Sequence, residues 1–284
     1  MPYQSNFRPG LFKDKVVIVT GGGSGIGRCT AHELASLGAH VAIVGRKVEK
    51  LITVAAEIAE DGGSCSTHVC DIRDEPVVIQ TIDDVLSRFG RIDGLVNNAG
   101  GQYPSEMKNI STKGFEAVVR NNLTGGFIFM REVYNRWMEQ HGGSIVNIIA
   151  DIWNGWPNFA HSAAGRGGMF TLSETAACEW AHANVRVNSL APGVIASSGF
   201  DTYSDEAWVE VRKMIARLPM GRPGTESEVA AAIVFLLSPA AAYITGTCVR
   251  VDGAHPNARQ SMTPRAAGNK TPFNGFHRAG PVRQ

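Results

Sequence analysis

The sequence has almost no excess charge of either sign. Its 27 Lys and Arg residues are balanced by 26 Asp and Glu residues, which gives a formal net charge of +1. Such a chain has no overall field that would recruit nucleic acid or an anionic membrane. We therefore expect neither of these partners, and we expect ligands to be recognised by local groups.

Long apolar runs and paired cysteines are also missing. No segment approaches the roughly 18 consecutive apolar residues of a membrane span, and the amino terminus MPYQSNFRPGLFKDK lacks the apolar centre of a signal peptide. The 5 cysteines are scattered and lack the short paired spacings of a zinc site. We expect a cytoplasmic protein with reduced thiols and no metal.

What the sequence does contain is an alternation of short apolar runs and helical segments. KVVIVT is followed by RCTAHELASLGA, HVAIVGR is followed by KVEKLITVAAEIAEDGG, and the alternation continues to CVRVDG. This pattern predicts a parallel sheet covered by helices on both faces, a doubly wound α/β fold in a single domain. We place an N-terminal arm at residues 1–11 and the domain at residues 12–256.

The tail at residues 257–284 breaks the alternation because it is rich in Gly, Pro, Ala and Arg. Two arrangements are compatible with this composition: a mobile tail, or an arm that docks on a neighbouring subunit. In the second arrangement, four arginines would reach a partner's site or a CoA phosphate: Arg259, Arg265, Arg278 and Arg283.

The segment TGGGSGIG lies between the first expected strand and the first expected helix, which is the context of a phosphate-binding turn. Gly21 allows a tight turn, Gly25 lets the backbone approach a pyrophosphate, and Gly27 lets the helix pack on the strand. Ser24 and Ile26 complete the candidate cofactor loop. An ordinary glycine-rich turn is the alternative.

The end of the second expected strand bears on the choice of nucleotide. Gly45 is followed there by Arg46 and Lys47, whereas an NAD site would place a carboxylate against the adenosine ribose. Arg46 can bind a 2′-phosphate bidentately, which favours NADPH as the cofactor. The alternative is a solvated charge at the start of a helix.

Taken in order, the motifs TGGGSGIG, CDI, NNAG, NNLTG, APG and YITGTCVRVDG resemble those of the short-chain dehydrogenase/reductase family. The resemblance covers residues 12–253 and implies a Rossmann fold with seven parallel strands, assembled as a dimer or tetramer through its long helices. It also implies that Asn122 holds ordered water or substrate beside the catalytic groups. The cofactor contacts it implies are Asp71, Ile72, Asn98, Ala99, Gly100, Pro192, Gly193, Ile195 and Ser197.

Within this family, the middle of the chain is most similar to the peroxisomal trans-2-enoyl-CoA reductases and then to the 2,4-dienoyl-CoA reductases. The segments NNAGGQYPS, ISTKGFEAVV, GGSIVNII, HSAAGRGG and APGVIAS carry this similarity. It implies an acyl-CoA substrate and a role in fatty acid metabolism.

The family's usual catalytic residues are absent. Members that interconvert alcohols and ketones use Ser, Tyr and Lys, whereas this chain has Ala150, Ser162 and Arg166 at these positions. The Lys lowers the pKa of the Tyr phenol from about 10, so that the phenol exchanges protons near neutrality. Arg166 can bind the cofactor ribose but cannot release a proton, and Ser162 donates a hydrogen bond but is a poor acid.

This loss is compatible with one reaction above all. Hydride addition to the β-carbon of an unsaturated thioester places charge on the thioester oxygen, where hydrogen-bond donors stabilise it. We therefore predict an NADPH-dependent reductase of an enoyl- or dienoyl-CoA. The alternatives are a ketone reductase or alcohol dehydrogenase for a bulky apolar or ring-bearing substrate, and a non-catalytic nucleotide-binding subunit. The last is favoured by Phe170 and Glu174, which stand where the trans-enoyl reductases have a second Tyr and Lys.

Other candidate residues surround this position. His161, with an ordinary pKa near 6.5, is either a proton donor or a helix cap. Asp151 either orients His161 or Arg166, or caps a loop, and Tyr103 faces the pocket or its rim. The apolar loop DIWNGWPNF supplies two expected walls of a substrate site, Trp153 and Trp156.

Overall fold

The computed structural model describes residues 2–197, 205–258 and 271–280. Seven strands form one parallel sheet in the order β3-β2-β1-β4-β5-β6-β9, which confirms the predicted doubly wound fold. The strands are β1 (Val16–Thr20), β2 (His40–Gly45), β3 (Ser64–Val69), β4 (Gly94–Asn97), β5 (Gly143–Ile148), β6 (Val185–Pro192) and β9 (Cys248–Val251). A separate two-residue pairing joins β7 (Ile195–Ala196) to β8 (Gly224–Thr225).

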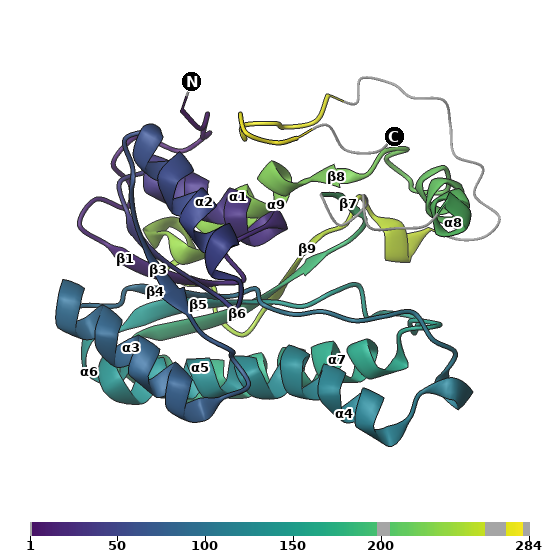
Figure 1. Cartoon of the computed structure of the whole chain (residues 1–284), viewed down its shortest axis with the longest axis horizontal. Coiled ribbons are helices and arrows are strands. Elements are labelled where there is room, and N and C mark those ends of the chain that lie inside the picture. Colours follow the sequence, from purple (N-terminus) through teal and green to yellow (C-terminus); the bar gives the residue numbers. More distant parts are fainter. Residues whose placement is uncertain (1, 198–204, 259–270, 281–284) are drawn as a thin grey trace.

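Helices cover both faces of this sheet (Figure 1). One layer contains α1 (Gly25–Ser36), α2 (Val48–Glu60) and α9 (Glu226–Leu237). The other contains α3 (Glu75–Phe89), α4 (Thr112–Val119), α5 (Gly125–Val133), α6 (Glu139–His141) and α7 (Ala160–Trp180), and α8 (Asp205–Ile215) lies beyond the end of the sheet. None of the helices in the described part of the chain combines the length and apolarity of a membrane span.

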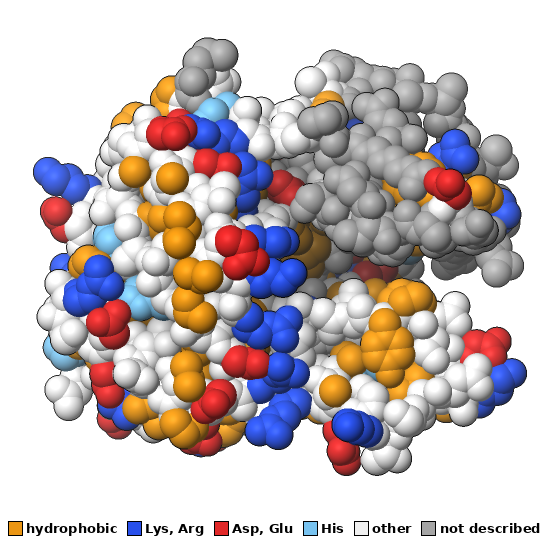
Figure 2. All heavy atoms as spheres, in the orientation of Figure 1, with side chains coloured by type: hydrophobic (Ala, Val, Ile, Leu, Met, Phe, Trp, Pro, Cys, Tyr) orange, Lys and Arg blue, Asp and Glu red, His pale blue; other side chains and the backbone are white. Residues whose placement is uncertain are grey.

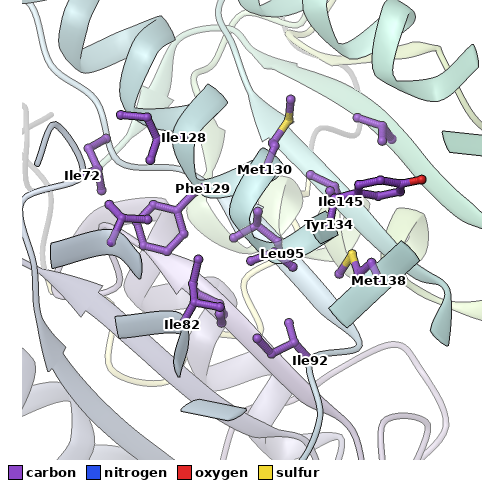
Figure 3. Close-up of a cluster of buried hydrophobic side chains, with 14 of the residues drawn as sticks. Ile72, Ile82, Ile92, Leu95, Ile128, Phe129, Met130, Tyr134, Met138 and Ile145 are labelled. Atoms are coloured by element: carbon purple, nitrogen blue, oxygen red, sulfur yellow. The ribbon is translucent and has the colours of Figure 1, made fainter. Parts of the chain in front are cut away.

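The core lies between the sheet and the two helical layers. Ile82 of α3, Leu95 of β4 and Phe129 of α5 are fully buried and lie together on one side of the sheet (Figure 3). All five residues of β1 are buried, as expected for a central strand of a parallel sheet that is covered on both faces. This burial holds the ends of β1 and β4 in place for the site described below.

Strand order places that site. The chain runs outward from β1 to β2 and β3, then returns to β4 on the other side of β1. A crevice forms where the strand order reverses, outside the carboxyl ends of the strands. The glycine-rich turn follows β1 and the NNAG segment follows β4, so both motifs border this crevice.

The described part of the tail shows neither of the two arrangements we considered. Residues 271–280 pack on their own chain, where the Gln4 N–H donates to Gly275 O at 2.9 Å and Phe276 is only 2% exposed. Arg278, which a docking arm would bring to a partner's site or a CoA phosphate, instead binds Glu60 and Asp61 of this chain. Three of the arginines lie outside the described residues: Arg259, Arg265 and Arg283.

Candidate active site

A cleft of about 270 Å³ opens at the crevice between β1 and β4. Ten predicted cofactor residues line it: Gly21, Ser24, Ile26, Arg46, Asp71, Ile72, Asn98, Ala99, Gly100 and Ser197. Four further lining residues were missed by the sequence analysis: Val44, Gly45, Cys70 and Asn121. Val44, Gly45 and Cys70 stand at the ends of β2 and β3, so strand order explains their place in the cleft. Asn121 is the first residue of the NNLTG motif, but we had assigned no role to it.

The glycine-rich turn has the geometry that a pyrophosphate site needs. Gly25 has φ of +57°, a conformation that side chains disfavour, and it begins α1. A Cβ atom on Gly27 would lie 2.3 Å from Gly21 O, so only glycine allows the helix to approach the turn this closely. The free N–H groups at the start of α1 are then available to an anion. These residues fit a dinucleotide cofactor.

At one end of the cleft, Arg46 faces the cavity and Asp71 is held by its neighbour. Arg73 donates to both carboxylate oxygens of Asp71, at 2.9 and 2.6 Å. This pairing, with a smaller contribution from Arg46, lowers the pKa of Asp71 to about 2, so the carboxylate stays ionised. Lys and Arg side chains form a band down the middle of the face shown in Figure 2, which suits the approach of an anionic ligand.

Asn122 and Ser162 meet behind the Gly100–Gly101 loop, next to the cleft but not among the residues that line it. Asn122 is 3% exposed and lies in a π-helical turn, Arg120–Thr124, where the wider backbone spacing interrupts the long helix. Its Oδ1 accepts the Gly101 N–H at 2.9 Å, and its Nδ2 donates to Ser162 Oγ at 3.2 Å. Ser162 Oγ in turn donates to Gln102 Oε1 at 3.3 Å, a contact that the sequence analysis did not foresee.

Arg166 lies one helical turn after Ser162, against the wall of the cleft. Its Nη1 donates to Ile148 O, and a Cβ atom on Gly100 would lie 2.1 Å from its Nη2, so Gly100 makes room for the guanidinium. Burial lowers the pKa of Arg166 to about 10, and the side chain therefore remains charged at neutral pH. Among the described residues, no carboxylate lies within ion-pair distance of it.

His161 is fully buried in the first turn of α7, so it is not a surface residue. Its Nδ1 accepts the Ser162 N–H at 2.8 Å, and the Tyr103 ring lies edge-on to it at a centroid distance of 4.6 Å. Tyr103 itself is 42% exposed, at the mouth of the site.

Asp151 contacts neither His161 nor Arg166, the two partners that we had considered for it. Its Oδ2 lies 3.2 Å from Nδ1 of His255, a residue after β9 that carried no motif. Burial raises the pKa of Asp151. Asp151 therefore ties the end of β5 to the segment that follows β9.

The two tryptophans of the following loop are half-buried. Trp153 packs against Phe170 at a centroid distance of 6.5 Å and under the Arg250 guanidinium at 5.0 Å, and Trp156 packs against Phe159 at 5.0 Å. Phe170 packs against the buried core, which explains an aromatic residue at that point of α7.

Comparison with known proteins identifies the family. Residues 21–254 match the family described as Enoyl-(Acyl carrier protein) reductase. The chain belongs to the short-chain dehydrogenase/reductase family.

Relatives within the short-chain dehydrogenase/reductase family include enzymes of unsaturated acyl-CoA. The chain is 36% identical over 242 residues to a probable 2,4-dienoyl-CoA reductase of Bacillus subtilis, covering 84% of this chain and 95% of that protein. It is 33% identical to a peroxisomal 2,4-dienoyl-CoA reductase of Pongo abelii, covering 88% and 87% of the two chains. Among solved structures, a citronellol catabolism dehydrogenase (AtuB) of Pseudomonas aeruginosa PAO1 is 56% identical with a TM-score of 0.81, covering 89% of this chain and 100% of that chain.

This short-chain dehydrogenase/reductase is an oxidoreductase related to the dienoyl-CoA reductases. Pro192, Gly193 and Ile195 lie where β6 ends and β7 begins, and a Cβ atom on Gly193 would lie 2.7 Å from Asp252 Cα. That contact packs the APG segment against the end of β9, next to the segment that carries His255.

Proposed function

We propose that the protein is an NADPH-dependent reductase of a conjugated acyl thioester, an enoyl- or dienoyl-CoA. One observation carries the proposal: the site combines a hydroxyl donor, Ser162, with a buried guanidinium, Arg166, and Ala150 leaves the Ser position without a hydroxyl. Such a site stabilises charge on an oxygen but lacks a tuned phenol that would protonate an alkoxide. The dienoyl-CoA reductase relatives support a thioester as the ligand.

The chemistry follows from these positions. A bound nicotinamide cofactor would supply the hydride. Ser162 would donate a hydrogen bond to the thioester oxygen as enolate charge develops, and Arg166 would hold the cofactor ribose while adding positive charge nearby. The α-carbon would take its proton from water or from His161. Asn122 would keep Ser162 in the donating orientation.

NADPH is favoured over NADH by the charges at the far end of the cleft. Arg46 faces the cavity with Lys47 next to it, so a 2′-phosphate would meet a cation. Asp71, the carboxylate that lines this end, is already held by Arg73.

A panel of enoyl- and dienoyl-CoA esters of different chain lengths tests the proposal by NADPH oxidation. We expect turnover with at least one ester. Clear NADPH binding without turnover of any ester would refute the proposal and favour the non-catalytic nucleotide-binding subunit.

A second candidate is a dehydrogenase for a branched acyclic alcohol or its carbonyl product. It is favoured by the 56% identity to the citronellol catabolism dehydrogenase. Citronellol with NADP⁺ tests it directly. His161→Phe and Tyr103→Phe separate the two functions, because carbonyl chemistry that uses either side chain as its acid would collapse, whereas enoyl reduction would only slow.

The proposed assembly is a homodimer or homotetramer through α5 and α7. An apolar groove of about 480 Å³ runs between these helices, and Phe127 at its edge is 37% exposed. A second copy of the same helices would cover it. Phe127→Glu should reduce the mass measured by light scattering if this groove is the interface, and an unchanged mass would exclude it.

A further inference from the structure

A directional hydrogen-bond chain begins and ends in the loop after β4. The Gly101 N–H donates to Asn122 Oδ1, Asn122 Nδ2 donates to Ser162 Oγ, and Ser162 Oγ donates to Gln102 Oε1. The first donor and the last acceptor thus belong to consecutive residues. The series of hydrogen bonds therefore starts and ends at the same loop, with Asn122 and Ser162 between its two ends.

The direction of this chain is fixed by its first member. A backbone N–H can only donate, so the Asn122 amide must present its oxygen to Gly101 and its NH₂ group to Ser162. Ser162 Oγ accepts that bond, and its own proton is left to point at a further acceptor. Ser162 is therefore set as a donor toward whatever oxygen lies next to it, and in this structure that oxygen is the side-chain carbonyl of Gln102.

Tyr103, the next residue of the loop, packs against His161, which carries a second hydrogen-bond donor. Because His161 Nδ1 accepts the Ser162 N–H, the neutral imidazole carries its proton on Nε2. This Nε2 atom is buried and has no hydrogen-bond partner among the described residues. An unpaired buried donor is unfavourable, and the arrangement is explained if a ligand supplies the acceptor. Tyr103 packs edge-on against this ring.

We propose that Gln102 stands in for the carbonyl oxygen of the substrate. Its side-chain amide occupies the acceptor position beside Ser162 until a ligand carbonyl displaces it, and the incoming oxygen also accepts from His161 Nε2. The loop Gly101–Tyr103 is thus a gate that selects ligands with a carbonyl group. Assigning that carbonyl to a thioester rests on the proposed function; the gate itself requires only a carbonyl.

Binding measurements with and without a ligand carbonyl test the gate. The ligands are crotonyl-CoA, its thioether analogue in which CH₂ replaces the carbonyl, and the aldehyde citral, each titrated into the NADP⁺-saturated enzyme so that no turnover occurs. We expect Gln102→Ala to tighten crotonyl-CoA binding about five-fold, the size of one hydrogen bond that no longer competes. The thioether and NADPH should bind as they do to the wild type.

Two controls separate the gate from a general effect on folding. Gln80→Ala replaces an exposed glutamine of α3 and should change no binding constant. In a Ser162→Ala background, Gln102→Ala should lose its five-fold effect, because the hydroxyl over which the two carbonyls compete is gone.

Each result of these binding measurements either supports or overturns the gate. A gain with citral alone supports the gate and refutes the thioester as substrate. Unchanged or weaker binding of both carbonyl ligands, an equal gain for the thioether, or a gain that persists without Ser162 would each overturn the gate. Failure of every variant to bind either carbonyl ligand would also overturn it.

Discussion

Two buried charges in this molecule have no partner of opposite sign among the described residues, and they lie in different regions. Arg166 borders the cleft, where its Nη1 donates to the backbone carbonyl of Ile148. Glu33 of α1 is fully buried under the two chain ends, where it accepts hydrogen bonds from Tyr3 Oη at 3.1 Å and Ser5 Oγ at 2.9 Å. The first region faces a ligand site and the second joins termini.

The two groups differ in whether they can lose their charge when they are buried. Desolvation raises the pKa of Glu33 to about 7, so about half of this carboxyl is protonated near neutral pH and it becomes neutral as the pH falls further. Desolvation lowers the pKa of Arg166 only to about 10, so the guanidinium stays charged. A charge that cannot be neutralised in a cleft is stabilised by a ligand, whereas a neutral carboxyl suits a structural contact. We therefore infer that Arg166 serves ligand binding and that Glu33 serves the stability of the fold.

Replacing Arg166 by Met should have the largest effect on activity. Under the proposed function, we expect kcat/KM for the unsaturated thioester to fall about 1,000-fold, because the guanidinium proposed to hold the ribose and to add positive charge beside the reacting oxygen is lost. We also expect the cofactor-free protein to be as stable as the wild type or more stable, since the desolvated charge is removed. Steady-state kinetics and thermal unfolding measure the two effects.

Arg166→Lys is the matched control for this change. It keeps a cation at the position where the family's Lys would stand and should retain most of the NADPH affinity. A Met variant that is less stable but fully active would show that Arg166 has only a structural role.

The second region is tested by Phe276→Ala. Phe276 packs on Tyr3, on His32 and under the Arg28 guanidinium at 5.0 Å, so its removal leaves a cavity at the contact between the termini. We expect the free energy of unfolding to fall by about 4 kcal/mol in urea titrations. The fully exposed Tyr243 offers a control, since Tyr243→Ala should change stability little. A loss of less than about 1 kcal/mol for Phe276→Ala would mean that the C-terminal segment contributes little to the fold.

Glu33→Gln tests the role of Glu33 in stability through its dependence on pH. The pKa of Glu33 is raised from 4.5 to about 7 on folding, so its favourable contribution is fully present below 4.5 and is lost as pH rises to 7. This loss amounts to about 3 kcal/mol in the wild type, and the Gln variant should not show it. Urea unfolding at pH 4.5, 6 and 8 measures the difference, and parallel curves for the two proteins would contradict the assignment.

The sequence predicted the site of Arg166 better than that of Glu33, for a physical reason. Motifs such as the glycine-rich turn and NNAG lie at strand ends, and the parallel sheet brings all strand ends to one edge. Glu33 has the spacing of an ordinary helix residue, and its hydrogen-bond partners, Tyr3 and Ser5, come from the N-terminal segment, on which residues 271–280 pack in turn. A segment with no apolar periodicity gives no signal for such a contact, which rests on buried Phe276 together with backbone hydrogen bonds and the ion pairs of Arg278.

Gln102 and His255 were missed for a related reason. Gln102 reaches Ser162 of α7 from the loop after β4, and His255 reaches Asp151 from a short turn after β9, over 60 and 104 positions of the sequence. No spacing rule relates positions that are this far apart and lie in different elements. The strand ends gave the location of the site, but the hydrogen-bond partners inside it required the structure.

An exposed cation at the same cleft should have the smallest effect, since water already solvates it. Arg46 faces the cavity rather than the core, so Arg46→Ser removes a phosphate contact without leaving a buried group unpaired. We expect the preference for NADPH over NADH, as a ratio of kcat/KM, to fall about 30-fold, the size of one charge-assisted hydrogen bond. Activity with NADH should change little because that cofactor has no 2′-phosphate. An equal loss with both cofactors would mean that Arg46 supports the fold of the cleft, and an unchanged ratio would move recognition of the phosphate to other residues.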